Sequence, residues 1–244
     1  MSLGAIIVCR LDSKRLPGKV LKKIRGKPLL WYVISRAKKI KSIDKNIIIA
    51  TTERKVDEPI VEYSHKERIK VFRGSAENVA KRVLSCAINN NLDYFLRVNA
   101  DSPFLEPSIA NLAFEIAQNS EYEIITNLYP RSFPYGVSVE LFSLKTFVES
   151  YKKMSSKDHF QHVSLYFYQN MHLFHYYNIL QKGMNHSDLR LTIDTPEDFK
   201  KFDEVLGMMD TKWEMIHYKD VIDFYKIREN KKYDYSFLYS AQRI

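Results

Sequence analysis

The sequence contains few cysteines and no long hydrophobic run. Only two of its 244 residues are cysteine, Cys9 and Cys86, which is too few for a disulfide framework or a cysteine-rich metal site. The apolar run before Arg10 is five residues long, too short for a signal peptide. No stretch reaches the roughly 18 apolar residues of a membrane-spanning helix. We therefore expect a cytoplasmic protein with no membrane partner, in which Cys9 is a core residue and not a nucleophile.

Three common motifs of nucleotide and sugar-nucleotide enzymes are also absent. The chain has no Gly-x-x-x-x-Gly-Lys-Ser/Thr, no Gly-x-Gly-x-x-Gly and no Asp-x-Asp. The first two are the glycine-rich phosphate-binding loops of P-loop and dinucleotide-binding proteins. The third is frequent in glycosyltransferases. A phosphate-binding site in this chain must therefore be built from a different loop.

The remaining composition is that of a globular protein with a basic surface. Hydrophobic residues make up 45% of the chain and charged residues 27%, and the formal net charge is +9. Lys and Arg are spread along the chain and not gathered in one block, so the charge is only weak evidence for nucleic acid as a partner. We expect no nucleic-acid partner, although a basic nucleic-acid-binding module stays the alternative of another class. A polyanionic small substrate would also suit this charge.

Short apolar runs alternate with helical periodicities over the first 120 residues. Buried strands are predicted at 5–9, 47–50, 71–72 and 94–98, and helices after Pro28, from about Asp57, over 78–88 and after Pro107. Strands that are apolar throughout and alternate with helices indicate a mostly parallel sheet covered on both faces. The predicted fold class is therefore α/β, an αβα sandwich.

From about residue 121 the alternation is less regular, which predicts a small β/α lobe. Strands are predicted at 124–126, 137–142, 174–179 and 190–193, and helices at 144–154, 159–170, 196–207 and 217–228. We expect a single domain over residues 1–228. An aromatic tail over 229–244 would form an edge strand or an arm on a partner subunit.

The loop after the first predicted strand is rich in cations. They are Arg10, Lys14, Arg15 and Lys19, and Ser13 lies among them. A nucleoside triphosphate carries about four negative charges, so its site needs cations and oriented N–H donors. Ligands of parallel sheets bind outside the carboxyl ends of the strands, which is where this loop would lie. From the residues alone, a basic turn ending at Pro17-Gly18 is an equally good interpretation.

Two carboxylates follow apolar runs and could bind a metal. Asp101 comes after the strand predicted at 94–98, and Asp194 after the one at 190–193. Magnesium prefers oxygen ligands, commonly one or two carboxylates together with substrate phosphates. Alternatively, Asp101 only caps a turn before Pro103, and Asp194 or its neighbour is the N-cap of a helix. Both roles can hold together if Asp194 binds the metal and Thr195 is the N-cap.

Together these segments resemble the cytidylyltransferases of spore-coat polysaccharide synthesis, a family related to CMP-3-deoxy-manno-octulosonate and CMP-acylneuraminate synthetases. The matching segments are Arg10-x-x-Ser13-x-Arg15-Leu16-Pro17-Gly18-Lys19-Val20-Leu21, Gly26-Lys27-Pro28-Leu29-Leu30, Val71-Phe72-Arg73-Gly74-Ser75, Arg97-Val98-x-x-Asp101-x-Pro103, Pro134-x-Gly136-x-x-Val139-Glu140-Leu141-Phe142, His162-Val163 and Asp194-Thr195-Pro196-Glu197-Asp198. The chain departs from the family pattern at Ala100, Ser138 and Gln161.

The resemblance implies a glycosyltransferase-A-like nucleotidyltransferase fold, often dimeric. It implies a nucleotide half over about 1–120 and an acceptor and dimer half over about 121–228. The residues that it assigns to the nucleotide are Arg10, Ser13, Arg15, Lys19, Arg73, Ser75 and Asn99. Those that it assigns to catalysis are Lys19, Arg15 and Asp101, and those to Mg²⁺ or Mn²⁺ are Asp101 and Asp194. The acceptor would lie near Arg131, His162 and Arg190.

The expected reaction is the transfer of CMP from CTP to an acidic sugar, such as a 2-keto sugar acid, with release of pyrophosphate. Such a product would serve the synthesis of a surface polysaccharide or glycan. Transfer from another nucleoside triphosphate to a sugar phosphate is the alternative among enzymes. The expected partners are CTP, the acidic acceptor and a second copy of the chain.

Overall fold

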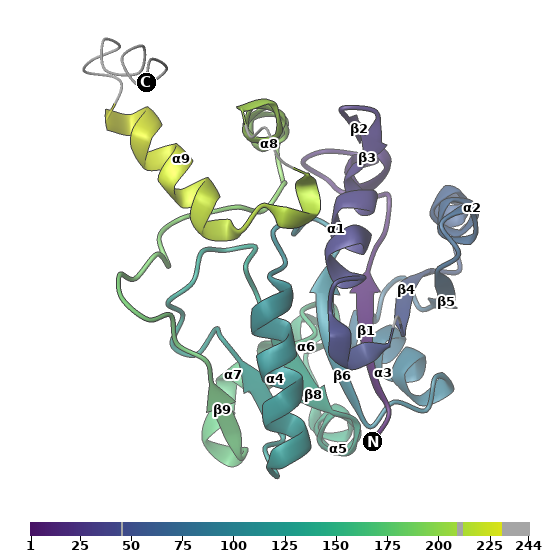
Figure 1. The fold of residues 1–244 in the computed structure, drawn as a ribbon. Coiled ribbons are helices and arrows are strands. Elements are labelled where there is room, and N and C mark those ends of the chain that lie inside the picture. The colour runs from purple at the N-terminus through teal and green to yellow at the C-terminus, as the bar shows by residue number, and fades with distance from the viewer. Residues whose placement is uncertain (45, 209–211, 231–244) are drawn as a thin grey trace, which may run out of the picture.

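The computed structural model describes residues 1–44, 46–208 and 212–230 (Figure 1). A seven-stranded sheet runs through it in the order β5-β4-β1-β6-β8-β7-β9. Its strands are β1 (Leu3–Val8), β4 (Ile47–Thr52), β5 (Lys70–Gly74), β6 (Tyr94–Asn99), β7 (Ile124–Thr126), β8 (Glu140–Ser143) and β9 (Tyr176–Asn178). Among these strands β8 alone is antiparallel to its neighbours. A short ribbon pairs β2 (Lys23–Ile24) with β3 (Lys27–Pro28).

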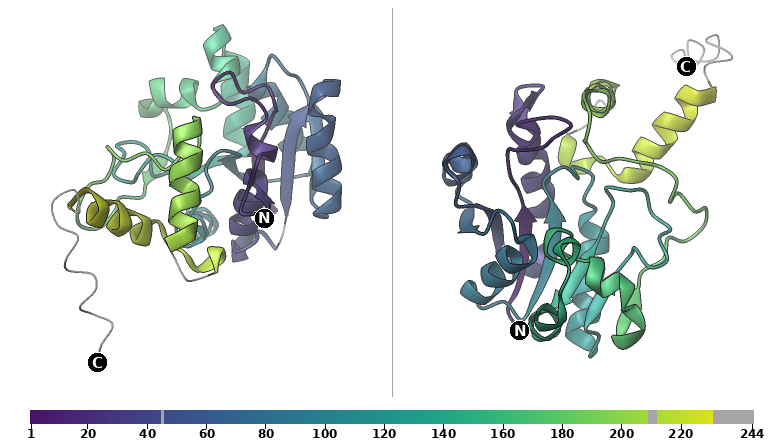
Figure 2. Two further views of the ribbon diagram at one scale, coloured as in Figure 1. Left: turned by 90° about the horizontal axis from the view of Figure 1, so that it is seen from above. Right: turned by 180° about the vertical axis from the view of Figure 1, so that it is seen from behind.

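Helices cover both faces of the sheet, as the views from above and behind show (Figure 2). One face carries α1 (Leu29–Ala37), α2 (Glu58–Lys66), α4 (Pro107–Asn119), α8 (Pro196–Met208) and α9 (Tyr218–Asn230). The other carries α3 (Val79–Asn89), α5 (Leu144–Lys153), α6 (Lys157–Gln161) and α7 (Leu165–Gln169). Short 3-10 helices are η1 (Lys19–Leu21), η2 (Lys41–Ile43), η3 (Lys55–Asp57), η4 (Met171–Leu173) and η5 (Trp213–Met215). No helix in the described ranges is long and apolar enough to span a membrane.

The central strand β1 shows why both faces must be covered. Ala5 and Ile7 point into one hydrophobic core, and Ile6 points into the other. All three side chains are fully buried. A strand without a polar face belongs to a sheet with helices on both sides, which confirms the αβα sandwich predicted from its continuous apolar run.

The end of the described chain packs back onto the first helix. Tyr32 of α1 contacts Phe202 of α8 and Trp213 of η5, with ring centroids 5.1 and 5.2 Å away. The indole N–H of Trp213 also donates to the carbonyl oxygen of Tyr32. Edge-to-face packing of this kind adds stability beyond the buried area. It holds α8, and with it the segment before the helix that contains Asp194, beside the first half of the chain.

Three element predictions were wrong. The helix predicted over 159–170 is divided into α6 and α7, because His162 leaves the helical conformation at φ −107° and ψ 84°. The strand predicted at 137–142 begins only at Glu140. Residues 190–193 form no sheet strand, because their amides bond to different loops: that of Leu191 to Tyr135, and that of Ile193 to Asp101. Residues 231–244 of the predicted tail lie outside the described part of the chain.

Candidate active site

A cleft of about 440 Å³ opens at the carboxyl ends of β1 and β6. Its lining includes residues 8–10 and 99–101 from these strand ends, the loop over 12–15, and Lys19. The amino-terminal turn of α3, the end of α6 with His162, and Asp194 also line it, as do Val20 and Arg97. This is where parallel sheets bind ligands, because the loops that follow their strands meet at this edge.

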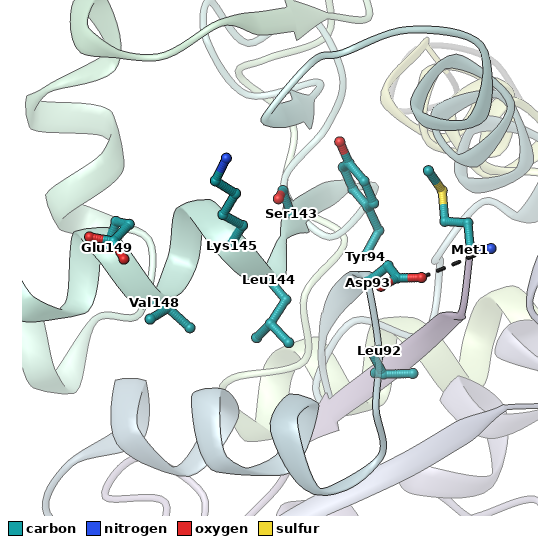
Figure 3. Close-up of a pocket in the computed structure, with 9 residues that line it drawn as sticks. All are labelled: Met1, Leu92, Asp93, Tyr94, Ser143, Leu144, Lys145, Val148 and Glu149. Carbon is teal, nitrogen blue, oxygen red and sulfur yellow. Dashed lines mark ion pairs between the residues drawn. The ribbon is translucent and has the colours of Figure 1, made fainter.

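A second pocket, of about 570 Å³, lies at the opposite edge of the sheet (Figure 3). Met1 and residues 92–94 of its lining stand where β1 and β6 begin, and the others come from the end of β8 and from α5. Figure 3 shows Asp93 directed at the amino group of Met1, 3.9 Å away. Lys145 and Glu149 are the other charged residues of its wall. This pocket is larger than the cleft but lacks a cluster of cations. We therefore assign the candidate active site to the cleft.

Asp57 holds the cation-rich loop over the sheet. It is fully buried, and its carboxylate accepts a hydrogen bond of 2.7 Å from the backbone amide of Leu11. Arg54 adds a bridge, because it contacts Asp57 at 3.0 Å and Asp12 at 2.6 Å. Gly18 closes the loop in the left-handed conformation, at φ 67°, where glycine carries no steric penalty. The sequence predicted only that a helix begins near Asp57.

Lys19 joins the two predicted metal-binding carboxylates. Its side chain is 9% exposed, and its ammonium lies 2.8 Å from Asp101 and 3.0 Å from Asp194. The third ammonium hydrogen bond, of 3.0 Å, goes to the carbonyl oxygen of Ile193. An ammonium has three donors, and all three are used here. Residues from three distant parts of the chain therefore meet at one point.

Asp194 has further cationic neighbours. Arg15 contacts one of its oxygens at 2.8 Å and Arg190 the other at 3.5 Å. Burial raises the pKa of Asp194, but the hydrogen bond and charge of Lys19 and the charge of Arg15 outweigh it, so that the net pKa is lowered. Two carboxylates thus face three cations, Lys19, Arg15 and Arg190. The cluster has a net positive charge, which suits an anionic ligand.

The carboxylates also suit a divalent cation. Oxygens of Asp101 and Asp194 converge on one nitrogen, within 3.0 Å, and hard oxygen ligands are those that Mg²⁺ and Mn²⁺ accept. In the described part of the chain no group of three or more His, Cys, Asp or Glu side chains could enclose a metal. Phosphate oxygens and water would therefore supply the remaining ligands, which is the usual arrangement for Mg²⁺.

Asn99 is oriented by a buried polar network. Its side-chain oxygen accepts a hydrogen bond of 2.8 Å from Arg97, which also forms an ion pair with Glu140. Glu140 is 4% exposed and accepts a second hydrogen bond, of 3.0 Å, from the hydroxyl group of Tyr168. Burial, with the charge of Glu140, raises the pKa of Tyr168, so this hydroxyl stays a donor. The network fixes the wall of the cleft beside Asp101.

The cleft lining brings together eight of the predicted site residues and leaves out four. Those that line it are Arg10, Ser13, Arg15, Lys19, Asn99, Asp101, His162 and Asp194. Those outside its lining are Arg73, Ser75, Arg131 and Arg190.

The residues outside the lining have partners of their own. Arg73 forms an ion pair with Glu58 at 2.6 Å, and the hydroxyl group of Ser75 accepts a hydrogen bond from the amide of Asn78. The guanidinium carbons of Arg131 and Arg190 lie 4.1 and 5.0 Å from the ring centre of Tyr135. Arg190 remains linked to the cleft through Asp194.

The lining also contains residues that the sequence analysis missed as site residues. They include Val79, Arg82, Arg97 and Gln161. The sequence offered a signal for two of them, because Asn78 is a residue type that favours the N-cap of a helix. In the structure its side chain does accept a hydrogen bond from the amide of Lys81. A helix that begins directly after β5 places its first turn at the carboxyl edge of the sheet. Val79 and Arg82 therefore come to the cleft.

Comparison with known proteins identifies the family. The family model described as Cytidylyltransferase matches residues 4–242. The chain belongs to the cytidylyltransferase family. This confirms the resemblance seen in the sequence, and it makes the protein a nucleotidyltransferase.

The relatives of this cytidylyltransferase agree with that assignment. It is 28% identical over 202 residues to the spore coat polysaccharide biosynthesis protein SpsF of Bacillus subtilis, covering 80% of this chain and 82% of that protein. It is 30% identical over 113 residues to the 3-deoxy-manno-octulosonate cytidylyltransferase of Geobacter metallireducens, covering 46% and 43%. The solved structure of a cytidylyltransferase from Leptospira borgpetersenii is 28% identical, with a TM-score of 0.88 and coverage of 94% and 96%. The expected glycosyltransferase-A-like fold is thereby confirmed.

Proposed function

We propose that this cytidylyltransferase transfers CMP from CTP to a small acidic sugar, such as a 2-keto sugar acid, for the synthesis of a surface polysaccharide or glycan. The observation that carries the proposal is the bridge from Lys19 to Asp101 and Asp194, at 2.8 and 3.0 Å, beside a cation-rich loop. The names of the matched relatives from Bacillus subtilis and Geobacter metallireducens support the acceptor class.

The nucleotide would bind over the loop after β1. Arg10, Ser13 and Arg15 line the cleft there and would contact the triphosphate oxygens. Arginine suits this task because its planar guanidinium makes paired hydrogen bonds to phosphate. Lys19 would stabilise negative charge at the α-phosphate as it develops, and Asn99 would face the nucleoside.

Arg73 and Ser75 would act on the nucleoside from behind the cleft wall. Arg73 donates to the carbonyl oxygens of Thr52 and Glu53, so it fixes the ends of β4 and β5 relative to each other. Ser75 caps the turn that leads into α3. Both residues would shape the nucleoside site without lining it.

The reaction would be an in-line displacement at the α-phosphorus. An acceptor hydroxyl oxygen forms the new P–O bond, the bond to the β-phosphate breaks, pyrophosphate leaves, and the hydroxyl proton passes to solvent or base. Asp101 and Asp194 would hold a Mg²⁺ or Mn²⁺ ion, which when bound neutralises phosphate charge as a Lewis acid. The protein would contribute mainly position and charge, as phosphoryl-transfer enzymes do.

An acidic acceptor would be held by the paired arginines on Tyr135. Arg131 and Arg190 stand over the ring of Tyr135, and Arg190 reaches Asp194 at 3.5 Å. A guanidinium group can fix the carboxylate of an acceptor and so orient its hydroxyl group, and Arg190 is the one linked to the cleft, through Asp194. His162, in the cleft wall at the end of α6, would lie on the acceptor side.

Pyrophosphate release, measured with each of the four nucleoside triphosphates against a panel of acidic sugars and sugar phosphates, tests the proposal. We expect release with CTP and a 2-keto sugar acid. Release with another nucleoside triphosphate and a sugar phosphate would contradict it and favour the alternative nucleotidyltransferase.

A further inference from the structure

Arg82 is a buried guanidinium at the cleft that forms no direct ion pair with any described carboxylate. It lies on α3, is 1% exposed and belongs to the lining of the cleft. One of its nitrogens donates to the carbonyl oxygen of Ser75 at 2.6 Å, and its Nε has no hydrogen-bond partner. Among the side chains that the structure describes, no carboxylate lies within ion-pair distance of it.

A second arginine shows what such a residue ordinarily requires. Arg36 of α1 is also 1% exposed, on the opposite face of the sheet, and it has Glu106 at 3.7 Å. Buried charges are normally paired because the loss of hydration is costly. Arg36 has this ion-pair partner and Arg82 does not, although each has one buried nitrogen without a hydrogen bond.

The carboxylate with the strongest influence on the charge of Arg82 is already engaged. Asp57 binds the amide of Leu11, the hydroxyl group of Thr52 and the guanidinium of Arg54. Burial, reinforced by the like charge of Arg10, lowers the pKa of Arg82 to about 10. Arg82 therefore stays cationic at neutral pH, in an environment that disfavours the charge.

The structure nevertheless makes room for this side chain. A Cβ atom at Gly74 would lie 3.1 Å from Cγ of Arg82 and 2.9 Å from the ring of Phe72. The absence of a side chain at Gly74 lets the aliphatic part of Arg82 pack under the end of β5. The bond to Ser75 then fixes the guanidinium group relative to the turn between β5 and α3.

We propose that Arg82 is a nucleotide-binding residue whose missing partner is an oxygen of the bound nucleotide, from a phosphate or from the pyrimidine carbonyl. This rests on the proposed use of a nucleoside triphosphate. A phosphate or carbonyl oxygen offers the acceptor that the guanidinium group lacks. Arg10, a cation that also lines the cleft, is repelled by Arg82, and an anion bound between them would offset that repulsion.

The test separates binding from folding with three variants. Arg82→Met keeps the length of the side chain and removes its charge, Arg82→Lys keeps the charge and removes the planar fork, and Arg36→Met is the matched control. Binding of the four nucleoside triphosphates, CMP and pyrophosphate is measured by calorimetry without acceptor. Unfolding is followed in urea.

We expect Arg82→Met to weaken nucleotide binding about tenfold or more, since a hydrogen bond to a charged group is lost. We expect its urea midpoint not to fall, because a buried unpaired charge is removed. Arg82→Lys should lie between this variant and the wild type in affinity. Arg36→Met should lose stability and keep wild-type affinity.

The ligand series locates the partner atom. Equal losses for CTP and pyrophosphate assign Arg82 to the phosphates. Arg82 is assigned to the base if the Arg82→Met variant binds CTP and CMP more weakly but binds pyrophosphate as the wild type does. Its affinity for CTP should then also exceed that for UTP by less than in the wild type. A variant that binds all ligands as the wild type does, with a lower urea midpoint, overturns the inference and makes Arg82 structural. A wild type that binds none of the four triphosphates overturns the proposed function as well.

Discussion

Replacing Lys19 by methionine removes the cation that holds the two carboxylates of the cleft together. Breaking a buried ion pair costs about 3–5 kcal/mol when one charge is left alone. The side chain of Asp101 is 26% exposed, and Arg15 still neutralises Asp194, so both carboxylates keep some stabilisation. We therefore expect Lys19→Met to lower the free energy of unfolding by about 1–3 kcal/mol.

The effect on turnover should be larger than this loss of stability would explain. If Lys19 stabilises charge at the α-phosphate, its removal lowers turnover about a hundredfold or more, or ~2.7 kcal/mol, as loss of one pre-placed donor does. The KM for CTP should change less than turnover. Arg15→Ala should instead weaken CTP binding together with turnover, because its contact would exist in the ground state. Steady-state pyrophosphate release measures both variants.

A double variant separates the two roles of Lys19. In Lys19→Met with Asp101→Asn, the uncompensated carboxylate is gone, so the combined loss of stability should be smaller than the sum of the single losses. Turnover should not recover. Wild-type turnover in a folded Lys19→Met enzyme, or a loss confined to CTP affinity, would refute the assignment to the α-phosphate.

Three further results are expected. Asp101→Asn and Asp194→Asn should each reduce turnover by orders of magnitude in a folded protein, and robust turnover in either variant would show that its carboxylate is no metal ligand. Excess chelator should abolish turnover of the wild type, and robust turnover with chelator would contradict the requirement for a metal. Asp57→Ala should cost about 2–3 kcal/mol in urea unfolding and raise the KM for CTP, because a buried ion pair and the anchor of the loop are lost; an unchanged KM would mean that the loop keeps its shape without Asp57. Burial raises the pKa of the Cys9 thiol far above its usual range and that of the Cys86 thiol to about 12. A thiol reagent at pH 8 should therefore label neither cysteine in the native protein and both after unfolding. Rapid labelling of the native protein would contradict the burial of these cysteines.

Local sequence patterns were enough to predict most of the sheet and the position of the cleft. The apolar runs at 5–9, 47–50 and 94–98 became β1, β4 and β6, because a strand covered on both faces needs no polar alternation. The rule that ligands bind at the carboxyl ends of parallel strands then placed the loop over 10–19 and Asp101 at one edge. For Asp194 the local pattern left open a metal ligand and a helix cap, and the family resemblance favoured the metal ligand.

Only the tertiary structure decided which side chains meet. Asp194 reaches Lys19, 175 positions earlier, because the amide of Ile193 bonds to the carbonyl oxygen of Asp101. Arg82 is part of a helix whose pattern marks it as ordinary, yet packing against Gly74 buries it at the cleft. Arg73, in a matching segment, pairs instead with Glu58 outside the lining. The pattern of apolar residues in a short segment shows which faces of its own helix or strand are buried. The partners of a long cationic side chain depend instead on how separate elements pack together, and no short stretch of sequence encodes that packing.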